Sequence, residues 1–171
     1  MIVRPHRSDD HEAAKRIYAE AFRRPEDPDS LPSEAPLFEA LCEAGDFLPE
    51  FSFTAEAENE AVGHVTASKG TVAAEPVVAV GPIGVLPEHQ GMGIGSALME
   101  ALLSAADAAQ VPLVVLLGSP RYYSRFGFQA AEELGVISPD AAWGDAFQAR
   151  PLTAYSARLA GPFRYAPAFS P

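Results

Sequence analysis

The segment that decides the fold is GPIGVLPEHQGMGIGSALMEALL, residues 81–103. It completes an apolar run over residues 77–85, which predicts a strand buried on both faces. A proline-containing loop follows, then glycines at alternating positions and an amphipathic pattern typical of a helix that begins at Gly91. Glycines at a helix N-terminus let several backbone N–H groups approach one anion, and the helix dipole favours that anion. The segment therefore predicts a phosphate-binding loop between a strand and a helix.

Two familiar nucleotide motifs do not fit this loop. A G-x-G-x-x-G fingerprint counted from Gly91 or Gly93 finds Ser96 or Leu98 at its last position. A P-loop requires a lysine after its glycines, and no lysine follows Lys69 in the chain. Glycines that only permit tight packing remain an alternative, but the three glycines and the polar Gln90 favour a ligand.

Composition narrows the class of protein. The 171 residues, 48% of them apolar, can bury one sizeable core, so we expect residues 1–171 to form a single domain. The net charge of −11 argues against nonspecific binding to nucleic acid or to anionic membranes. No basic segment precedes an apolar one at the start, and every apolar run is too short to span a bilayer, so we predict a cytoplasmic protein. The single cysteine, Cys42, excludes an internal disulfide and multi-cysteine zinc sites, and we predict no metal.

Working outward, the rest of the chain alternates helical and extended patterns. Strands are expected at residues 2–4, 51–56, 62–67, 113–117, 126–130 and 143–152, and helices at residues 13–22, 37–45 and 120–125. Ser8, Asp9 and Asp10 are candidate N-caps of the first helix, and Ser119 of the last one. Residues 153–171 are expected to form an irregular tail, which Phe163, Tyr165 and Phe169 hold against the domain.

Three parts of the sequence together resemble the GNAT superfamily of acetyl-CoA-dependent N-acetyltransferases. Residues 90–95, QGMGIG, are similar to the family's [RQ]-x-x-G-x-[GA] pyrophosphate loop, and residues 83–85 to its fourth strand. Tyr123, four residues before Gly127-Phe128, resembles the second half of the family. The resemblance implies an α/β fold with a mixed sheet whose two central parallel strands, residues 77–85 and 111–117, splay apart.

The resemblance also implies the cofactor site, with acetyl-CoA as cosubstrate. The pantetheine arm would pair with the backbone at Ile83 and Val85, and backbone amides of residues 90–96 would hold the pyrophosphate. Arg121 or Arg125 could contact the outer phosphate or simply be solvated. The family's usual asparagine after the fifth strand is absent, and Ser119 lies in that region. The implied cofactor-binding residues are Ile83, Gly84, Val85, Gln90, Gly91, Met92, Gly93, Ile94, Gly95 and Ser96.

Catalysis requires a base for the amine, a donor for the tetrahedral oxyanion and an acid for the leaving thiolate. Tyr123 is the predicted acid, because a phenol stays protonated near neutral pH, and Tyr122 is the alternative. A backbone amide near Val85 is the predicted oxyanion donor. The base is not identified by the sequence, and the candidates by region are His64, His89, Glu39, Glu43 and Glu56.

The predicted function is acetyl transfer from acetyl-CoA to a primary amine, by direct attack in a ternary complex. An acetyl-CoA-binding sensor or partner module without transferase activity is the main alternative, and a different acyl donor or a purely structural domain are others. The expected partner is a small-molecule or peptide amine, and homodimer formation is left open. We expect no nucleic acid and no membrane as partner.

Overall fold

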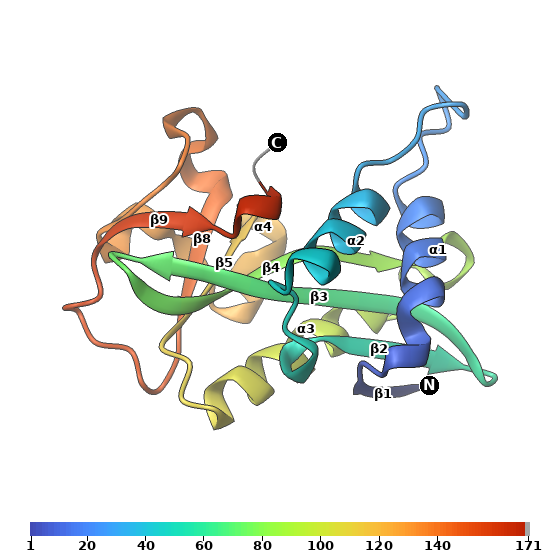
Figure 1. Ribbon diagram of the computed structural model, residues 1–171, viewed down its shortest axis with the longest axis horizontal. Coiled ribbons are helices and arrows are strands. Elements are labelled where there is room, and N and C mark those ends of the chain that lie inside the picture. Colours follow the sequence, from blue (N-terminus) through green and yellow to red (C-terminus); the bar gives the residue numbers. More distant parts are fainter. Residues whose placement is uncertain (170–171) are drawn as a thin grey trace.

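The computed structural model describes residues 1–169, and its centre is one mixed β-sheet (Figure 1). The strands pair in the order β1-β2-β3-β4-β5-β8-β6, while β9 pairs with the far end of β3 and also with β7. Their bounds are β1 Ile2–Pro5, β2 Phe53–Ala57, β3 Glu60–Val72, β4 Glu75–Val85, β5 Leu113–Leu117, β6 Gln129–Ala130, β7 Val136–Ile137, β8 Phe147–Pro151 and β9 Gly161–Tyr165.

Within residues 1–169, four α-helices join the strands: α1 His11–Ala21, α2 Glu34–Ala44, α3 Ile94–Ala108 and α4 Pro120–Tyr123. Short 3-10 turns complete the chain, at η1 Ser8–Asp10, η2 Pro49–Phe51, η3 Pro87–His89, η4 Ser124–Phe126, η5 Ala131–Leu134, η6 Ala141–Ala146 and η7 Pro167–Phe169. No helix within residues 1–169 is both long and apolar enough to cross a membrane.

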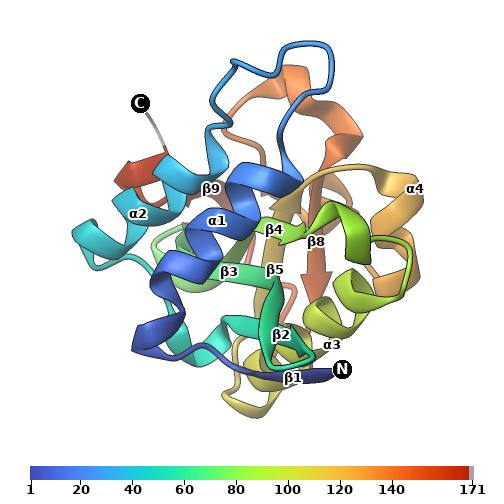
Figure 2. The same cartoon turned by 90° about the vertical axis from the view of Figure 1, so that its right-hand side faces the viewer.

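Two glycines in neighbouring strands show which helix covers which face of the sheet. A Cβ atom on Gly63 would lie 3.0 Å from Ile94 of α3, whereas one on Gly84 would lie 3.1 Å from Tyr18 of α1. Because Gly84 pairs with His64, the residue after Gly63, the two glycines point to opposite faces. Helices α1 and α2 therefore cover one face and α3 the other, as Figures 1 and 2 show.

The two central parallel strands separate halfway along their length. Strands β4 and β5 pair at Val78↔Val114 and Ala79↔Val115, and within residues 1–169 the pairing stops there. Strand β4 continues to Val85 beside β3, while β5 continues to Leu117 beside β8. This confirms the predicted fold with splayed central strands, and it leaves one edge of residues 80–85 without a strand partner.

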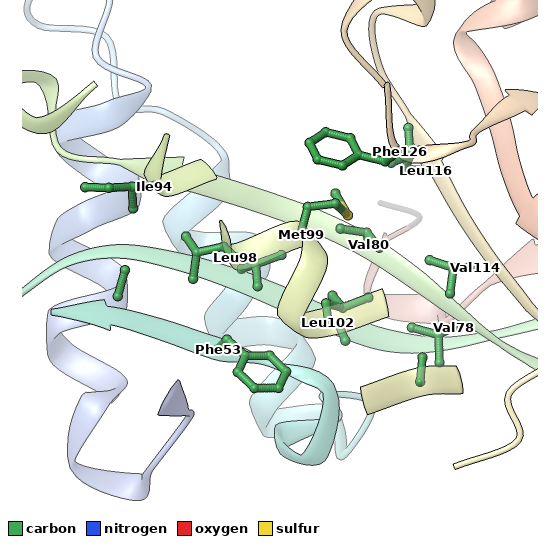
Figure 3. Close-up of a cluster of buried hydrophobic side chains, with 14 of the residues drawn as sticks. Phe53, Val78, Val80, Ile94, Leu98, Met99, Leu102, Val114, Leu116 and Phe126 are labelled. Carbon is green, nitrogen blue, oxygen red and sulfur yellow. The ribbon is translucent and has the colours of Figure 1, made fainter. Parts of the chain in front are cut away.

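Helix α3 closes one face of this gap with apolar side chains. Leu98, Met99 and Leu102 are fully buried and pack with Val80 of β4 and Leu116 of β5 in the main core cluster (Figure 3). The same helix thus contacts both diverging strands at once. Removing a buried leucine from such a core typically costs about 2–5 kcal/mol, so α3 is a major part of what keeps the two strands in place.

Several predicted elements differ from the structure, including the strand over residues 126–130, which is shortened to β6 Gln129–Ala130 because η4 reaches Phe126. The helix predicted from Gly91 begins at Ile94, because the left-handed backbone of the glycines at 91 and 93 belongs to the loop. The strand predicted from residue 143 begins at Phe147, since η6 occupies the preceding residues. The tail predicted as irregular contains β9, whose pairing with β3 places Phe163 in the core. Residues 170–171 of that tail lie outside the described residues.

The predicted side-chain caps also differ. Asp10 is the N-cap residue of α1, but it forms no cap hydrogen bond there. Its carboxylate instead accepts two bonds from the Arg4 guanidinium, at 2.7 and 2.8 Å, and one from the Arg7 backbone N–H. Arg4 also binds Glu56, so this ion cluster fastens β1 to η1 and β2. Ser119 precedes α4 without a side-chain cap. Both helices therefore depend on packing rather than on side-chain caps.

Candidate active site

The loop between β4 and α3 has an open concave side. Gly91 and Gly93 have φ angles of 73° and 82°, a left-handed conformation that costs glycine little. A Cβ atom built on either glycine would meet no other atom within 4 Å. The absence of both side chains therefore leaves the backbone of the loop accessible to a ligand.

The same loop gathers unpaired backbone donors. The first hydrogen bond of α3 runs from the Ala97 N–H to the Gly93 carbonyl at 3.0 Å, so the three N–H groups before it have no helical acceptor. Within residues 1–169, the N–H groups of Gly91, Met92 and Gly93 also form no hydrogen bond with protein atoms. Up to six consecutive N–H groups at a helix N-terminus fit a pyrophosphate, which is anionic and rich in acceptors.

Gln90 ties this loop to the end of β4. Its Nε2 donates to the Val85 carbonyl at 3.0 Å, which fixes the loop relative to the strand. That carbonyl, one of the backbone groups expected to meet the pantetheine arm, therefore already has a protein partner. Ile83 lines the cavity described next, whereas Gly84 faces α1 on the other side of the sheet.

A cavity of about 670 Å³ occupies the gap between the diverging strands. Residues 80–83 of β4, Leu116 and Leu117 of β5, and Tyr123 of α4 form one part of its wall. A second part comes from segments distant in sequence, namely Phe22, Glu34, Leu37, Pro139, Asp140, Trp143, Tyr165 and Phe169. The gap between the strands thus opens into one chamber, with Tyr123 on its wall.

The two neighbouring tyrosines of α4 occupy different places. The Tyr123 ring packs against the Gly118 backbone, where a Cβ atom would lie only 2.5 Å from it, and the ring lines the cavity. Tyr122 instead directs its hydroxyl toward α3, at 3.4 Å from the position of a Gly95 Cβ atom. The rings meet edge to face, with centroids 4.9 Å apart. Tyr123 therefore faces the chamber, and Tyr122 faces the glycine loop.

Burial, followed by the neighbouring Tyr122, raises the pKa of the Tyr123 phenol above its ordinary value. The hydroxyl therefore stays protonated at neutral pH, as a proton donor must. Arg125 holds its guanidinium carbon 4.4 Å from the centre of the Tyr122 ring and donates Nε–H to the Tyr122 carbonyl. Arg121 is exposed on the surface of α4.

The base candidates that the sequence suggested do not line this cavity. His64 is fully buried on the α1 face, where Nδ1 lies 2.7 Å from the Tyr18 hydroxyl and Nε2 lies 2.9 Å from His6 Nδ1. Glu39 pairs with Lys15 on the neighbouring helix. The other candidates also lie outside the cavity wall: Glu56 binds Arg4, Glu43 is exposed on α2, and His89 lies in η3.

Cys42 lies on α2 and does not line the cavity. The thiol is half-buried, and burial raises its pKa to about 11, which suits a packed side chain and not a nucleophile. Within residues 1–169, no group of three or more His, Cys, Asp or Glu side chains could hold a metal ion.

Two carboxylates of the cavity wall were missed by the sequence analysis. Glu34 is the first residue of α2 and is half-buried. Asp140 lies at the exposed rim, and its Oδ1 accepts from the Ala142 N–H at 2.8 Å. Neither belongs to a local motif, because the α1–α2 loop and a segment about 100 residues later approach each other only in the folded chain. No pattern in the sequence would have singled them out.

An open gap between two central parallel strands, beside a helix N-terminus with several unpaired N–H groups, is typical of a class of ligand-binding α/β domain. A family model described as "Acetyltransferase (GNAT) family" matches residues 11–128. The chain belongs to the GNAT acetyltransferase family, in agreement with the resemblance of its loop and strand motifs.

Sequence relatives and solved structures agree with this assignment. The chain is 33% identical over 111 residues to the uncharacterized N-acetyltransferase YjhQ of Escherichia coli (strain K12), an alignment that covers 62% of this chain and 61% of the relative. It is 34% identical over 101 residues to the uncharacterized N-acetyltransferase YhbS of the same strain, over 58% of this chain and 60% of the relative. These alignments thus span less than two thirds of either relative.

Two solved structures match almost the whole chain. A GNAT family acetyltransferase from Brucella melitensis, in complex with acetyl-CoA, has a TM-score of 0.79 and 27% identity, over 99% of this chain and 97% of the other. The YhbS structure from Escherichia coli, in complex with CoA, has a TM-score of 0.88 and 24% identity, over 99% and 92%. At 24% identity, the likeness to the YhbS structure shows that the two chains share a fold and no more than that.

Proposed function

We propose that residues 1–171 form one N-acetyltransferase domain, which transfers the acetyl group of acetyl-CoA to a primary amine. The observation that carries the proposal is the edge of β4 at residues 80–85, which has no strand partner among residues 1–169 and runs from the cavity that Tyr123 lines to the glycine loop. Its relatives are named N-acetyltransferases, and solved structures of the same fold contain CoA or acetyl-CoA.

The cofactor is recognised by the backbone in this proposal. The Gln90 N–H is already bonded to the Pro87 carbonyl, so amides of residues 91–96 hold the pyrophosphate, and the free edge of β4 at residues 83–85 pairs with the pantetheine arm as an added strand would. The hydrogen bond from Gln90 keeps the Val85 carbonyl in place, so pairing there uses its second lone pair or the neighbouring groups. A chain with a net charge of −11 can thus bind an anionic ligand without a basic side chain.

In the proposed reaction, the acetyl group passes from acetyl-CoA to an amine bound in the chamber. The neutral amine nitrogen forms a bond to the acetyl carbonyl carbon, the carbon–sulfur bond breaks, and the Tyr123 hydroxyl gives its proton to the sulfur. The proton lost by the amine nitrogen passes to solvent, from which Tyr123 is protonated again. The products are the N-acetyl amine and free CoA thiol, and an acceptor that arrives as an ammonium ion releases one further proton.

The test combines binding and turnover on the purified protein. Calorimetry measures acetyl-CoA affinity, and thiol release from acetyl-CoA is followed in the presence of a panel of primary amines. The proposal expects binding and at least one amine that accelerates thiol release, with the N-acetyl product found by mass spectrometry. Binding without turnover of any amine would indicate a sensor module, and absence of acetyl-CoA binding would contradict the site itself.

A further inference from the structure

The wall of the chamber beyond Tyr123 determines which amine fits. This inference rests on the proposed function and concerns its acceptor. We propose that the acceptor is a small primary amine with one cationic group on an aromatic or branched aliphatic body, bound through Glu34 and an aromatic wall that includes Trp143.

The acceptor end of the chamber has an apolar wall from three separate segments. Phe22 and Leu37 come from the first two helices, and Trp143 comes from η6. The C-terminal segment adds Tyr165 and Phe169, whose rings stack with centroids 4.4 Å apart. All five side chains are only partly buried, so their remaining surface is available to a ligand body. An apolar body that covers these surfaces gains affinity in proportion to the area removed from water.

The aromatic side chains meet across segments that the fold brings together. Trp143 and Tyr165 lie with ring centroids 6.3 Å apart at an angle of 68°. Helix α2 packs against η7, which carries Phe169, and Figure 1 shows this C-terminal turn beside α2. The aromatic wall and the carboxylate of Glu34 therefore line the same open cavity. Aromatic faces also attract an organic cation, which adds to the effect of a carboxylate.

The charged residues of the chamber wall are acidic. Glu34 and Asp140 are the charged residues of the wall, and among residues 1–169 no lysine, arginine or histidine lines the cavity. Asp140 lies at the exposed rim and already accepts from a backbone N–H, while Glu34 is half-buried and forms no ion pair with the described part of the chain. Glu34 is therefore the main partner for an ammonium group, and an acceptor that bears a carboxylate is repelled.

The volume of the cavity limits the size of the acceptor. The cavity volume of about 670 Å³ falls within the range of sites for small molecules, and the acetyl end of the donor takes up part of it. A polyamine would leave the aromatic wall uncovered while it brings several charges, and a polyhydroxylated amine would lose hydrogen bonds to water without replacement. A compact body with one ammonium group satisfies both the carboxylate and the apolar wall.

The test uses three probes that separate the contribution of the ammonium charge to binding from that of the apolar body. 2-Phenylethylamine has both, 2-phenylethanol has the body without the charge, and ethanolamine has the charge without the body. Trp143 is the single tryptophan of the chain, so its fluorescence reports occupancy of the chamber. With CoA present, which carries no acetyl group to transfer, we expect 2-phenylethylamine to bind at least about tenfold more tightly than either comparison probe. Equal affinity of 2-phenylethylamine and ethanolamine would overturn the inference.

Turnover and a matched pair of variants complete the test. Thiol release should show kcat/KM for 2-phenylethylamine at least about tenfold above that for ethanolamine or spermidine. Glu34→Gln should lower this value about tenfold through KM with unchanged acetyl-CoA affinity, whereas Glu43→Gln, exposed on the same helix, should leave it unchanged. Preference for spermidine, or a Glu34→Gln enzyme equal to wild type, overturns the inference while acetyl transfer stands. Loss of acetyl-CoA binding in the wild type would instead contradict the proposed function.

Discussion

The two ends of the gap between β4 and β5 differ in the chemical groups that line them: backbone N–H groups at one end and side chains at the other. At the glycine loop, the groups available to a ligand are backbone N–H groups of a few consecutive residues, 91–96. At the acceptor end, they are side chains that come from α1, α2, η6, β9 and η7. The loop can therefore stay the same while the acceptor end changes, because exchanging side chains at the acceptor end leaves the backbone of the loop in place. One fold can in this way combine a constant donor with different acceptors.

Tyr123 lies where the two ends meet, and its removal should give the largest effect. Tyr123→Phe keeps the ring that packs on Gly118 and loses the hydroxyl. We expect kcat to fall by about 10²–10⁴, because protonation of the leaving thiolate is needed only in the transition state, with little change in acetyl-CoA affinity. The measurement is kcat by thiol release and Kd by calorimetry.

Tyr122→Phe is the matched control for this experiment. The Tyr122 hydroxyl lies near Gly95 and faces the glycine loop, so its loss should change acetyl-CoA affinity more than kcat. A large loss of kcat in Tyr122→Phe alone would identify that tyrosine as the acid. Unchanged kcat in Tyr123→Phe would leave Tyr123 with a packing role.

The glycine loop should be sensitive to charge at one position. Gly93→Asp places a carboxylate on the open side of the loop, where we propose that the pyrophosphate binds, and we expect acetyl-CoA affinity to fall at least about 100-fold, or about 2.7 kcal/mol. Gly45→Asp is the control, because Gly45 has a similar φ of 73° and equally open surroundings at the end of α2. Calorimetry that gives equal affinity for Gly93→Asp and wild type would contradict the loop assignment.

The buried cluster behind the acceptor end should make the stability of the protein depend on pH. Behind the acceptor end, the Tyr18 hydroxyl donates to the Pro82 carbonyl of the cavity wall at 2.9 Å and contacts His64. Burial, followed by the charge of His6, lowers the pKa of His64 to about 3, below its unfolded value of about 6.5. The unfolded chain thus binds more protons between these values, so stability is fully present above pH 6.5 and is lost as pH falls toward 3.

The expected loss between pH 7 and pH 4.5 is about 2–3 kcal/mol in the free energy of unfolding, measured with urea at each pH. His6, whose pKa is also lowered by burial, changes stability in the same direction. His64→Gln should be less stable at pH 7 and should show a shallower loss toward pH 4.5. His89→Gln, in the loop before α3, is the control and should keep the wild-type slope. Equal slopes for His64→Gln and wild type would contradict the account of this buried cluster.

Gln90 should give the smallest effect. Gln90→Ala removes the hydrogen bond to the Val85 carbonyl, which holds the loop against β4 but does not itself face the phosphate site. We expect acetyl-CoA affinity to fall by about fivefold, consistent with one hydrogen bond of about 1 kcal/mol. A loss as large as that of Gly93→Asp would mean that the Gln90 side chain itself binds the cofactor.

The contrast between backbone and side chains explains what the sequence could predict. The run of residues 77–85 and the glycines after it are local patterns, so the strand and the loop after it were predicted correctly, whereas the splayed sheet, which the structure confirms, was implied by the resemblance to the GNAT family. Strand β5 has the predicted bounds, and Tyr123 lies on the wall of the cavity, although its role stays a prediction. Glycine conformation was the exception, because a repeat of glycines does not reveal that Gly93 would be the N-cap of α3.

The acceptor end could not be predicted for a physical reason. Glu34 and Trp143 approach the same chamber only through tertiary packing, and neither carries a motif. His64 was a candidate base by its strand alone, but the strand's alternation places it on the α1 face, away from the gap. The tail was expected to be irregular because it is rich in proline and glycine, yet its pairing with β3 is non-local and makes it a strand.

Backbone amide exchange with and without acetyl-CoA tests the central claim most directly. Because we propose that backbone groups bind the cofactor, acetyl-CoA should slow exchange at residues 91–96 and along the free edge of β4, residues 80–85. Exchange in β1, which lies at the outer edge of the sheet, should not change. Unchanged exchange at both the loop and β4 under saturating acetyl-CoA, or protection confined to another part of the sheet, would contradict the account.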